Sequence, residues 1–369
     1  MKVLQVINGW GSGGVERNLI NCFDMFNENG IETHIYARKK ISNIFDPYLK
    51  KYRIKLFVPE ERGRFPVSQF LKLKWFQKIV AEGEYDVVHI NGSSGDGFIF
   101  AYFVKKSHSS SKVVIHCHNP QIPQSHKIRN MIYNILGKKL FSKYGDCFLA
   151  CSKQARDFLF KNKSQCEIVN YSIDVAKYVF DKRGRASIRK QLNLDNHFVV
   201  GTIGRIERQK NPIYILKIIR ELIAIDNRII FLWVGEGAML EECKKFASTY
   251  HLDQNIVFAG TRDDVPSVLS AMDIFILPSL YEGLGIVNIE AQANGLQCFI
   301  SEQLPEEIDV TNQVHRLSIR VSPKIWAKEI LKYRNVLRNG LDHNIISGFD
   351  KNENALKVVK VYTDLLGKG

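Results

Sequence analysis

Two glutamates around a glycine-rich turn are the first residues of this chain whose types and spacing could do chemistry. In SLYEGLGIVNIEAQANG, residues 279–295, Glu282 precedes the turn and Glu290 follows it. The glycines let a ligand approach the backbone, and a helix beginning near Ile286 would offer unpaired N–H groups to an anion. Carboxylates accept hydrogen bonds from hydroxyls. The stretch favours a nucleotide sugar; the alternative is a helix-terminal carboxylate and a surface glutamate.

A second loop could hold the same anion with cations. In GTIGRIERQKNP, residues 201–212, Arg205 follows a glycine at the end of an expected strand, and Lys210 stands five positions later. The arginine could grip a diphosphate with its planar fork and the lysine as a point charge, with Arg208 also available. The alternative is a solvated basic loop.

The motif VIHCHNP, residues 114–120, places two histidines on one face of an expected strand. We expect His116 to be a core histidine. His118 lies nearest the carboxyl end of the strand, where it could donate a hydrogen bond to a sugar or phosphate, or act as an acid or base. A hydrogen-bonded core histidine is the alternative for His118.

A glycine cluster follows the first expected strand. NGWGSGGVERNL, residues 8–19, includes Gly11, Gly13 and Gly14 ahead of an expected helix from about Val15. The spacing matches neither a Walker loop nor the G-x-G-x-x-G dinucleotide motif. The cluster therefore indicates either a close approach to an anion or a plain turn.

Short apolar runs alternate with longer amphipathic segments, which predicts a parallel sheet covered on both faces. The pattern restarts near Phe198 after a lapse around residues 169–185, so we expect two doubly wound domains. Ligands of such sheets bind outside the carboxyl ends of the strands, and the default site is the cleft between two such domains. The expected strands are KVLQVI, THIYA, DVVHI, KVVIHC, DCFLAC, FVVGTIG, IIFLWVG, NIVFAG, DIFILPS and CFIS.

The composition is that of a globular protein, with 369 residues of which 45% are hydrophobic. Seven cysteines without C-x-x-C pairing indicate reduced thiols, and no metal-ligand spacing is present. The sequence shows no signal peptide and no apolar stretch near the roughly 20 residues of a membrane-spanning helix. We therefore expect a cytoplasmic protein.

The positive charge is concentrated in the first half. Residues 1–180 carry 27 Lys and Arg against 15 Asp and Glu, whereas residues 181–369 carry 25 against 23. A basic first half of this kind could attract nucleic acid, anionic lipid or an acidic substrate. Alternatively, the basic surface could only keep the protein soluble. Residues 62–80 and 126–145 mix lysines and arginines with aromatic residues. They could lie on an anionic membrane, or they could be core helices with a solvated basic face.

These motifs together resemble the family-four retaining glycosyltransferases of the GT-B fold, and the resemblance covers nearly the whole chain. It rests on GGVER, HCHN, GRIERQKNP, FAGTRDDV and EGLGIVNIE in this order. The longer phrase LPSLYEGLGIVNIEAQANGL, residues 277–296, is closest to members that build bacterial capsular or exopolysaccharide units. The resemblance implies an N-terminal acceptor-binding domain over 1–172, a nucleotide-sugar-binding domain over 173–352 and a C-terminal helix over 353–369. The helix is expected to return toward the first domain, and the two domains to face each other across a cleft.

The resemblance also implies a role for each motif. His118 would touch the transferred sugar, and Arg205 and Lys210 would hold the diphosphate of the leaving group. Glu282 would bind the sugar hydroxyls and Glu290 the ribose.

The remaining positions follow in the same way. Gly13 and Gly14 would lie over the diphosphate or the acceptor, and Thr261 and Arg262 would meet the base through backbone groups. VNYSID, residues 169–174, departs from the family, because Tyr171 and Ser172 replace a glycine-containing turn. The donor phosphate would meet the turn that starts the helix, formed by Gly283, Leu284, Gly285 and Ile286.

The implied partners are a nucleotide sugar, with UDP favoured, a lipid-linked or saccharide acceptor, and the anionic inner face of the cell membrane. No cofactor or metal is expected, since members of this fold need none and no D-x-D motif is present. An epimerase or phosphorylase of the same fold is the alternative enzyme. A nucleic-acid-binding protein is suggested only by basicity, and no RNA- or DNA-binding signature accompanies it.

Overall fold

The computed structural model describes the whole chain except residues 12, 61–66, 93, 94, 96, 108, 120–126, 161, 162, 337, 339–347, 368 and 369. The chain forms two compact units, one made of Met1–Ile173 with Gly348–Gly369 and the other of Asp174–Ser347. The second unit thus ends before residue 352, where we expected the boundary. The reason is a hydrogen bond of 2.8 Å from the Ile173 N–H to the Phe349 carbonyl, which holds the returning chain against the first unit.

The first unit contains a parallel sheet of seven strands in the order β3-β2-β1-β4-β5-β6-β7. The order reverses between β1 and β4, so the loops after these two strands flank the switch point. The strands are β1 (Lys2–Ile7), β2 (Glu32–Ala37), β3 (Lys55–Phe57), β4 (Val87–Gly92), β5 (Lys112–Cys117), β6 (Cys147–Ala150) and β7 (Cys166–Ile168).

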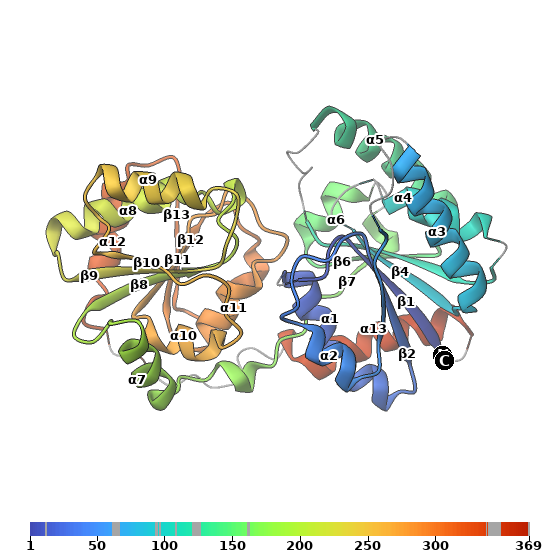
Figure 1. Cartoon of the computed structure of the whole chain (residues 1–369), viewed down its shortest axis with the longest axis horizontal. Helices are drawn as coiled ribbons and strands as arrows, with labels where there is room; N and C mark the ends of the chain where they lie inside the picture. The colour runs from blue at the N-terminus through green and yellow to red at the C-terminus, as the bar shows by residue number, and fades with distance from the viewer. Residues whose placement is uncertain are drawn as a thin grey trace. The chain divides into compact units, whose positions relative to one another are not determined.

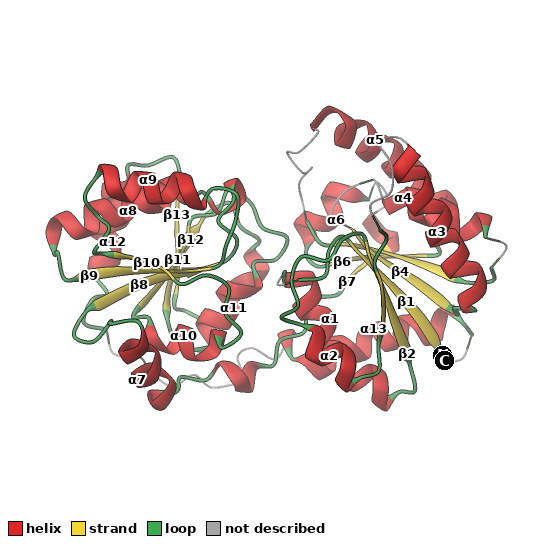
Figure 2. Cartoon of the chain, in the orientation of Figure 1, coloured by secondary structure: helices red, strands yellow, loops and turns green. Residues whose placement is uncertain are grey.

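Helices cover both faces of this sheet (Figures 1 and 2). One layer includes α3, α4 and α5, and the opposite layer includes α1 and α13, which pack on each other. The expected C-terminal helix is thus present as α13, which packs within the first unit. The helices are α1 (Gly14–Glu28), α2 (Asp46–Lys51), α3 (Val67–Gly83), α4 (Gly97–Lys106), α5 (Lys127–Tyr144), α6 (Lys153–Leu159) and α13 (Lys351–Leu365).

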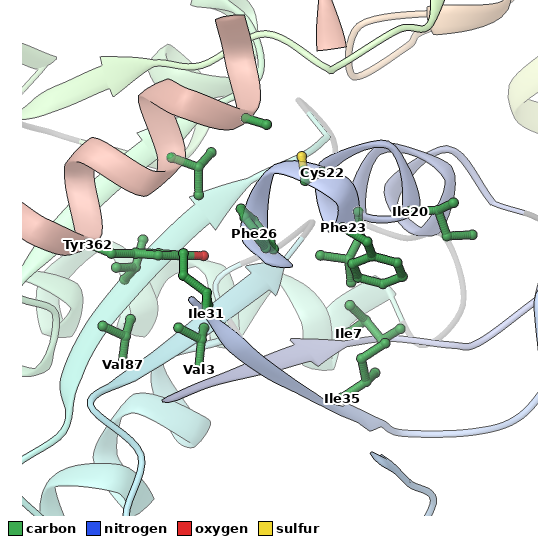
Figure 3. Close-up of a cluster of buried hydrophobic side chains, with 14 of the residues drawn as sticks. Val3, Ile7, Ile20, Cys22, Phe23, Phe26, Ile31, Ile35, Val87 and Tyr362 are labelled. Atoms are coloured by element: carbon green, nitrogen blue, oxygen red, sulfur yellow. The ribbon is translucent and has the colours of Figure 1, made fainter. Parts of the chain in front are cut away.

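The core beneath α1 and α13 explains why these segments fold together. Alternate residues of the strands, such as Val3 and Ile7, point to this face and meet Phe23 and Phe26 of α1. Figure 3 shows Tyr362 reaching from α13 into the same cluster, beside Phe26. Burial of this apolar surface, at about 25 cal/mol per Å², stabilises the first unit and holds the C-terminal helix in it.

The second unit contains a parallel sheet of six strands in the order β10-β9-β8-β11-β12-β13. Its order reverses between β8 and β11. The strands are β8 (Phe198–Ile203), β9 (Ile229–Val234), β10 (Ile256–Phe258), β11 (Ile274–Leu277), β12 (Gln297–Ser301) and β13 (Val314–Leu317). The helices are α7 (Lys182–Gln191), α8 (Pro212–Ile225), α9 (Leu240–Thr249), α10 (Val265–Ala271), α11 (Ile286–Ala293) and α12 (Pro323–Leu331).

All ten strands expected from the sequence are present, and the structure adds β3, β7 and β13. The helices expected near Val15, near Ile286 and at the C-terminus are confirmed. All seven cysteines are free, as expected for reduced thiols. Within the described part of the chain, no helix combines the length and apolar character needed to cross a membrane.

Candidate active site

The loops after β8 and β11 meet at the switch point of the second sheet. The Leu280 N–H donates to the Gln209 carbonyl at 2.8 Å, and the Gln209 side chain donates to the Tyr281 carbonyl at 3.2 Å. The Asn211 amide reaches the Pro278 carbonyl at 3.3 Å. These bonds join the basic loop to the glycine-rich turn at the edge where open parallel sheets bind ligands.

Lys210 and Glu282 form an ion pair where the two loops join. The Lys210 Nζ lies 2.8 Å from Glu282 Oε1, and Gln209 Nε2 donates to Oε2 at 3.0 Å. The side chains of Lys210 and Glu282 are only 13% and 8% exposed. An ammonium has three donors, so Lys210 can bind Glu282 and a further anion together.

The glycine before Arg205 makes room for this lysine. Gly204 has φ +147°, a conformation that residues with a side chain rarely adopt. A Cβ at this position would lie 2.5 Å from Lys210 Cε. Glycine is therefore required both by the backbone and by the space that the folded-back Lys210 side chain fills.

The start of α11 provides the expected anion-binding features. Its N-cap is Gly285, with φ +80°, and no side chain caps the helix. The first turn has no acidic residue, so the helix dipole and the N–H groups there are not offset by a carboxylate. Residues from Val287 to Ala293 are all buried, which fixes the helix axis. Gly283, Leu284 and Ile286 lie in this turn as expected.

Glu290 lies one turn further along α11, and it is buried. Its Oε1 accepts a hydrogen bond of 2.6 Å from the Tyr178 hydroxyl. Tyr178 comes from a 3-10 helix at Val175–Tyr178, just after the chain enters the second unit. The tyrosine fixes the orientation of the carboxylate. This partner could not be predicted, because Tyr178 lies 112 residues from Glu290 in a segment without periodicity.

Arg205 does not join the Lys210 pair. Its guanidinium lies 3.1 Å from Glu207 in the same loop, and its side chain is 62% exposed. Such an exposed pair contributes little to stability, which leaves the arginine able to turn toward an anion. Arg208 lies in the 3-10 helix Arg208–Lys210 that closes the loop.

Thr261 and Arg262 follow β10, where Gly235 and Gly260 form an isolated bridge between the loops after β9 and β10. The guanidinium of Arg262 binds both oxygens of Asp264, at 2.7 and 2.6 Å, and lowers the pKa of that carboxyl. It also donates to Gln191 at 2.9 Å. Arg262 is thus engaged within the second unit, and Thr261 is exposed beside it.

The expected site residues of the first unit lie at the carboxyl ends of β1 and β5. Gly13 is the N-cap of α1, and Gly14 is its first residue. His118 is 5% exposed; its Nδ1 lies 3.0 Å from the Tyr171 hydroxyl and its Nε2 lies 2.9 Å from Asn91 Oδ1. Burial lowers the pKa of His118 to about 3. Asn91 and Tyr171 were not singled out as partners from the sequence, because both lie far from His118 along the chain.

The structure thus brings Lys210, Glu282 and the start of α11 together, with Glu290 on the same helix. Arg205 lies on the same loop as Lys210, and Arg262 lies on the loop after β10; they pair with Glu207 and Asp264. In the residues described, no group of His, Cys, Asp and Glu side chains is arranged to hold a metal ion. Such an arrangement could bind a phosphate with the Lys210 ammonium and the N–H groups at the start of α11, beside carboxylates that can accept hydrogen bonds from hydroxyls.

Two α/β units, each built on a parallel sheet, are the architecture of the GT-B class. The crystal structure of Anabaena HepE with UDP and glucose matches with a TM-score of 0.82 at 16% identity, over 98% of this chain and 99% of that one. A sucrose-phosphate synthase of Thermosynechococcus elongatus matches with a TM-score of 0.78 at 16% identity, over 100% of both chains. These likenesses show the fold.

Two family models and the sequence relatives identify the family of this chain. The model for glycosyl transferases group 1 matches residues 184–332, and that for Glycosyltransferase Family 4 matches residues 12–177. The chain therefore belongs to the family-four glycosyltransferases. EpsF of Bacillus subtilis, named as a glycosyltransferase, is 24% identical over 90% of this chain and 87% of its own. The UDP-Gal:α-D-GlcNAc-diphosphoundecaprenol α-1,3-galactosyltransferase of Escherichia coli is 23% identical over 96% and 94%.

Proposed function

We propose that this glycosyltransferase moves a hexose from UDP to a lipid-linked saccharide, with retention of configuration, during assembly of a bacterial capsule or exopolysaccharide. The observation that carries the proposal is the Lys210–Glu282 pair at the junction of the two loops, next to the uncapped start of α11. It offers positive charge for a diphosphate beside a carboxylate for sugar hydroxyls.

The proposed mechanism follows from charge. As the anomeric C–O bond breaks, the diphosphate gains negative charge and the sugar gains positive charge. Lys210, Arg205 and the N–H groups at the start of α11 stabilise the diphosphate; loss of one such donor typically costs about 3 kcal/mol of transition-state stabilisation. The acceptor hydroxyl attacks from the face that the diphosphate leaves, and a departing phosphate oxygen takes its proton. Glu282 orients the sugar and Glu290, held by Tyr178, binds the ribose. We propose that these cations act without a metal.

The donor and acceptor classes are supported by the relatives. The Escherichia coli relative is named for UDP-galactose and for a diphosphoundecaprenol acceptor, and the Anabaena structure contains UDP and glucose. We extend UDP and a lipid-linked acceptor to this chain because Lys210 and the start of α11 offer groups that can bind a diphosphate.

We also propose that the enzyme works peripherally at the inner face of the cell membrane. The side chains of Ile128, Ile132 and Ile135 on α5 are 73%, 49% and 52% exposed, which is unusual for isoleucine. They share one face of the helix, because they stand four and three residues apart. The opposite side packs inward through Gly137, where a Cβ would lie 2.3 Å from the Gly95 carbonyl oxygen.

Basic and apolar residues on α3 extend this surface. Phe70 and Leu71 are 55% and 48% exposed, next to lysines of the same helix. Helices α3, α4 and α5 lie in the same layer (Figure 1). Apolar side chains that enter the headgroup region, with lysines that attract anionic lipid, are typical of interfacial helices. The basic residues at 62, 64, 126, 127 and 129 that contributed to the prediction lie outside the residues or side chains described.

A thermal-shift experiment tests the donor. UDP should raise the melting temperature more than ADP, GDP or CDP at equal concentration, because a ligand that binds only the folded state stabilises it. Glu290→Gln should reduce the UDP shift while leaving the unliganded melting temperature nearly unchanged. The proposal fails if no uridine nucleotide shifts the transition.

A transfer assay then tests the reaction. Labelled UDP-hexoses are incubated with lipid-linked saccharide acceptors, and the anomeric configuration of the extracted product is determined by NMR. Transfer with the α-configuration of the donor retained is expected. Conversion of the UDP-sugar without an acceptor would instead indicate an epimerase.

A further inference from the structure

A buried polar network crosses the first sheet on the face covered by α1 and α13. Gln5 of β1 stands opposite His89 of β4, and Asn91 of β4 stands opposite His116 of β5. His118 follows at the end of β5 on the same face, and its ring centroid lies 4.0 Å from that of His116. Gln5, His89 and His116 are all nearly inaccessible, and the proposed reaction uses none of them.

Two tyrosine hydroxyls complete the network. Tyr171 lies just before the point where the chain passes from the first unit to the second, and its hydroxyl is 3.0 Å from His118 Nδ1. Tyr362 extends from α13 into the core (Figure 3), and its hydroxyl is 2.6 Å from His89 Nδ1. The network therefore joins His118 to α13 and to the segment before Ile173, which we call the crossing segment because the chain passes to the second unit after it.

The direction of the hydrogen bonds is fixed at Asn91. Its Nδ2 lies 3.4 Å from the His89 carbonyl oxygen, which can only accept, and 2.9 Å from Gln5 Oε1. Its Oδ1 must therefore be the atom that faces His118, so His118 Nε2 carries the hydrogen and donates it. In a neutral imidazole Nδ1 is then an acceptor, and the Tyr171 hydroxyl donates to it.

The hydrogen bonds that lead from Asn91 through Gln5 to the other two histidines, which form a second branch of the network, can be assigned in the same way. Since Gln5 Oε1 accepts from Asn91, Gln5 Nε2 donates to the Tyr362 oxygen at 2.9 Å. His89 Nδ1 is the other hydrogen-bond partner of the Tyr362 hydroxyl among the described residues, so we assign the hydroxyl hydrogen to this bond. His89 Nε2–H then donates to His116 Nδ1 at 3.3 Å. This leaves the hydrogen of His116 on Nε2.

The branch ends at a small cavity. His116 Nε2 and Asn170 Oδ1 are buried and make no hydrogen bond with the protein, and both residues line this cavity. The space open to the centre of a water molecule is about 20 Å³, enough for a single water. One water could accept from His116 Nε2–H and donate to Asn170 Oδ1. Asn170 belongs to the crossing segment next to Tyr171, so both branches end there.

The surroundings keep all three histidines neutral. Burial lowers the pKa of His89 and of His118 to about 3 and holds the pKa of His116 well below its usual value. The groups facing His118 are Tyr171, whose pKa burial raises, and the neighbouring histidines, whose charges would repel. The Cys151 thiol, which hydrogen-bonds Tyr171, also has its pKa raised by burial. Glu16 of α1 is the buried carboxylate near these groups, and its charge adds to the rise in the pKa of Tyr171.

We propose that Tyr171 and Asn91 are positioning residues that hold His118 as a neutral imidazole with its hydrogen on Nε2, and that the network ends in a one-water site between His116 and Asn170. The consequence for catalysis rests on the proposed function: His118 takes part as a neutral ring and not as an acid or base at neutral pH, because one ring nitrogen donates to Asn91 and the other accepts from Tyr171. Tyr171, which replaces part of the glycine-containing turn of the family, would thus serve to position His118.

Histidine NMR of the whole chain tests the proposal without needing activity. In a ¹⁵N-labelled sample, Nε2 of His89, His116 and His118 should be protonated and Nδ1 unprotonated, with no change between pH 8 and pH 5. Resonances are assigned with single His→Gln variants. A protonated Nδ1 on His118, or titration of His118 near pH 6.5, would overturn the proposal.

Variants separate positioning from folding. Tyr171→Phe should move the His118 Nδ1 resonance toward that of an unbonded nitrogen. Asn91→Asp should raise the pH at which His118 titrates, because a carboxylate favours the charged ring. The matched control is Tyr85→Phe, which removes a similar hydroxyl 2.8 Å from His34 Nδ1 and should change His34 alone. An unchanged His118 in both variants would contradict the proposal.

Two further readouts complete the test. Tyr171→Phe should lower the turnover of UDP-hexose transfer severalfold with little change in KM, whereas Tyr85→Phe should not. If no transfer is found but the NMR result holds, the proposed function fails and the positioning inference stands. A high-resolution crystal structure should show one water within hydrogen-bond distance of His116 Nε2 and Asn170 Oδ1, and a dry cavity would remove that part of the proposal.

Discussion

At the scale of single residues, the Lys210–Glu282 pair raises the question of whether it is structural or functional. Breaking a largely buried ion pair leaves an uncompensated charge, whereas removing both charges often costs little. Function behaves differently, because a neutral pair can neither attract a diphosphate nor accept sugar hydroxyls as strongly. The two roles therefore respond oppositely to a double substitution.

The double substitution gives our first residue-scale prediction. Lys210→Met should destabilise the chain by about 3 kcal/mol, because Glu282 remains buried without its cation. Adding Glu282→Gln should restore most of the melting temperature. Both variants should still transfer sugar more than tenfold more slowly, a loss above about 1.4 kcal/mol of transition-state stabilisation. A double variant with wild-type transfer would show that the pair is structural only.

Glu290 shows how far the sequence could predict this site. The glycines, the helix start and the apolar run placed Glu290 on α11, and the alternation of strands and helices placed α11 at the sheet edge with the basic loop. The hydrogen bond from Tyr178 could not be predicted, because it depends on how a segment 112 residues away packs. The Lys210–Glu282 contact was equally hidden, since the motifs assigned these residues separate partners.

At the scale of elements, the loop after β8 holds Lys210 through the space at Gly204. Gly204→Ala should force Lys210 away, since the new Cβ would lie 2.5 Å from its Cε. We expect UDP affinity, measured by titration calorimetry, to fall at least tenfold.

The matched control is Gly30→Ala, where φ is +65° but no atom lies within 4 Å of the added Cβ. It should cost about 1 kcal/mol of stability and leave UDP affinity unchanged. If both variants lost UDP affinity equally, the explanation that Gly204 makes room for the Lys210 side chain would be refuted.

The three strands that the sequence did not predict share a physical cause. β3 and β7 have three residues each and β13 has four, and β3 and β13 contain charged or polar residues such as Lys55 and Arg316. All three lie at the edges of their sheets. Edge strands need less apolar surface than central strands, which are buried on both faces and read as continuous apolar runs. The central strands that position the site were therefore the predictable ones.

At the scale of the whole molecule, the uneven charge and the exposed apolar face of α5 concern the same unit. The net charge of +14 comes mostly from residues 1–180. Charge alone would draw the protein to any polyanion, whereas the apolar side chains of α5 would add affinity for an apolar surface such as a bilayer. The two contributions are separable, because salt screens the first and not the second.

Vesicle flotation separates these contributions. The whole chain should float with vesicles that contain phosphatidylglycerol, and it should float little with vesicles of phosphatidylcholine alone. Flotation should be weaker at 0.5 M salt than at low salt, because the Debye length, about 10 Å at 0.1 M, becomes shorter as salt is added. Ile132→Asp with Ile135→Asp should abolish flotation, because two carboxylates would enter the headgroup region. The control is Ile225→Asp, which changes an isoleucine of α8 that is 58% exposed in the second unit. Flotation that survives the α5 substitutions, or that the Ile225 substitution removes equally, would place the membrane contact elsewhere.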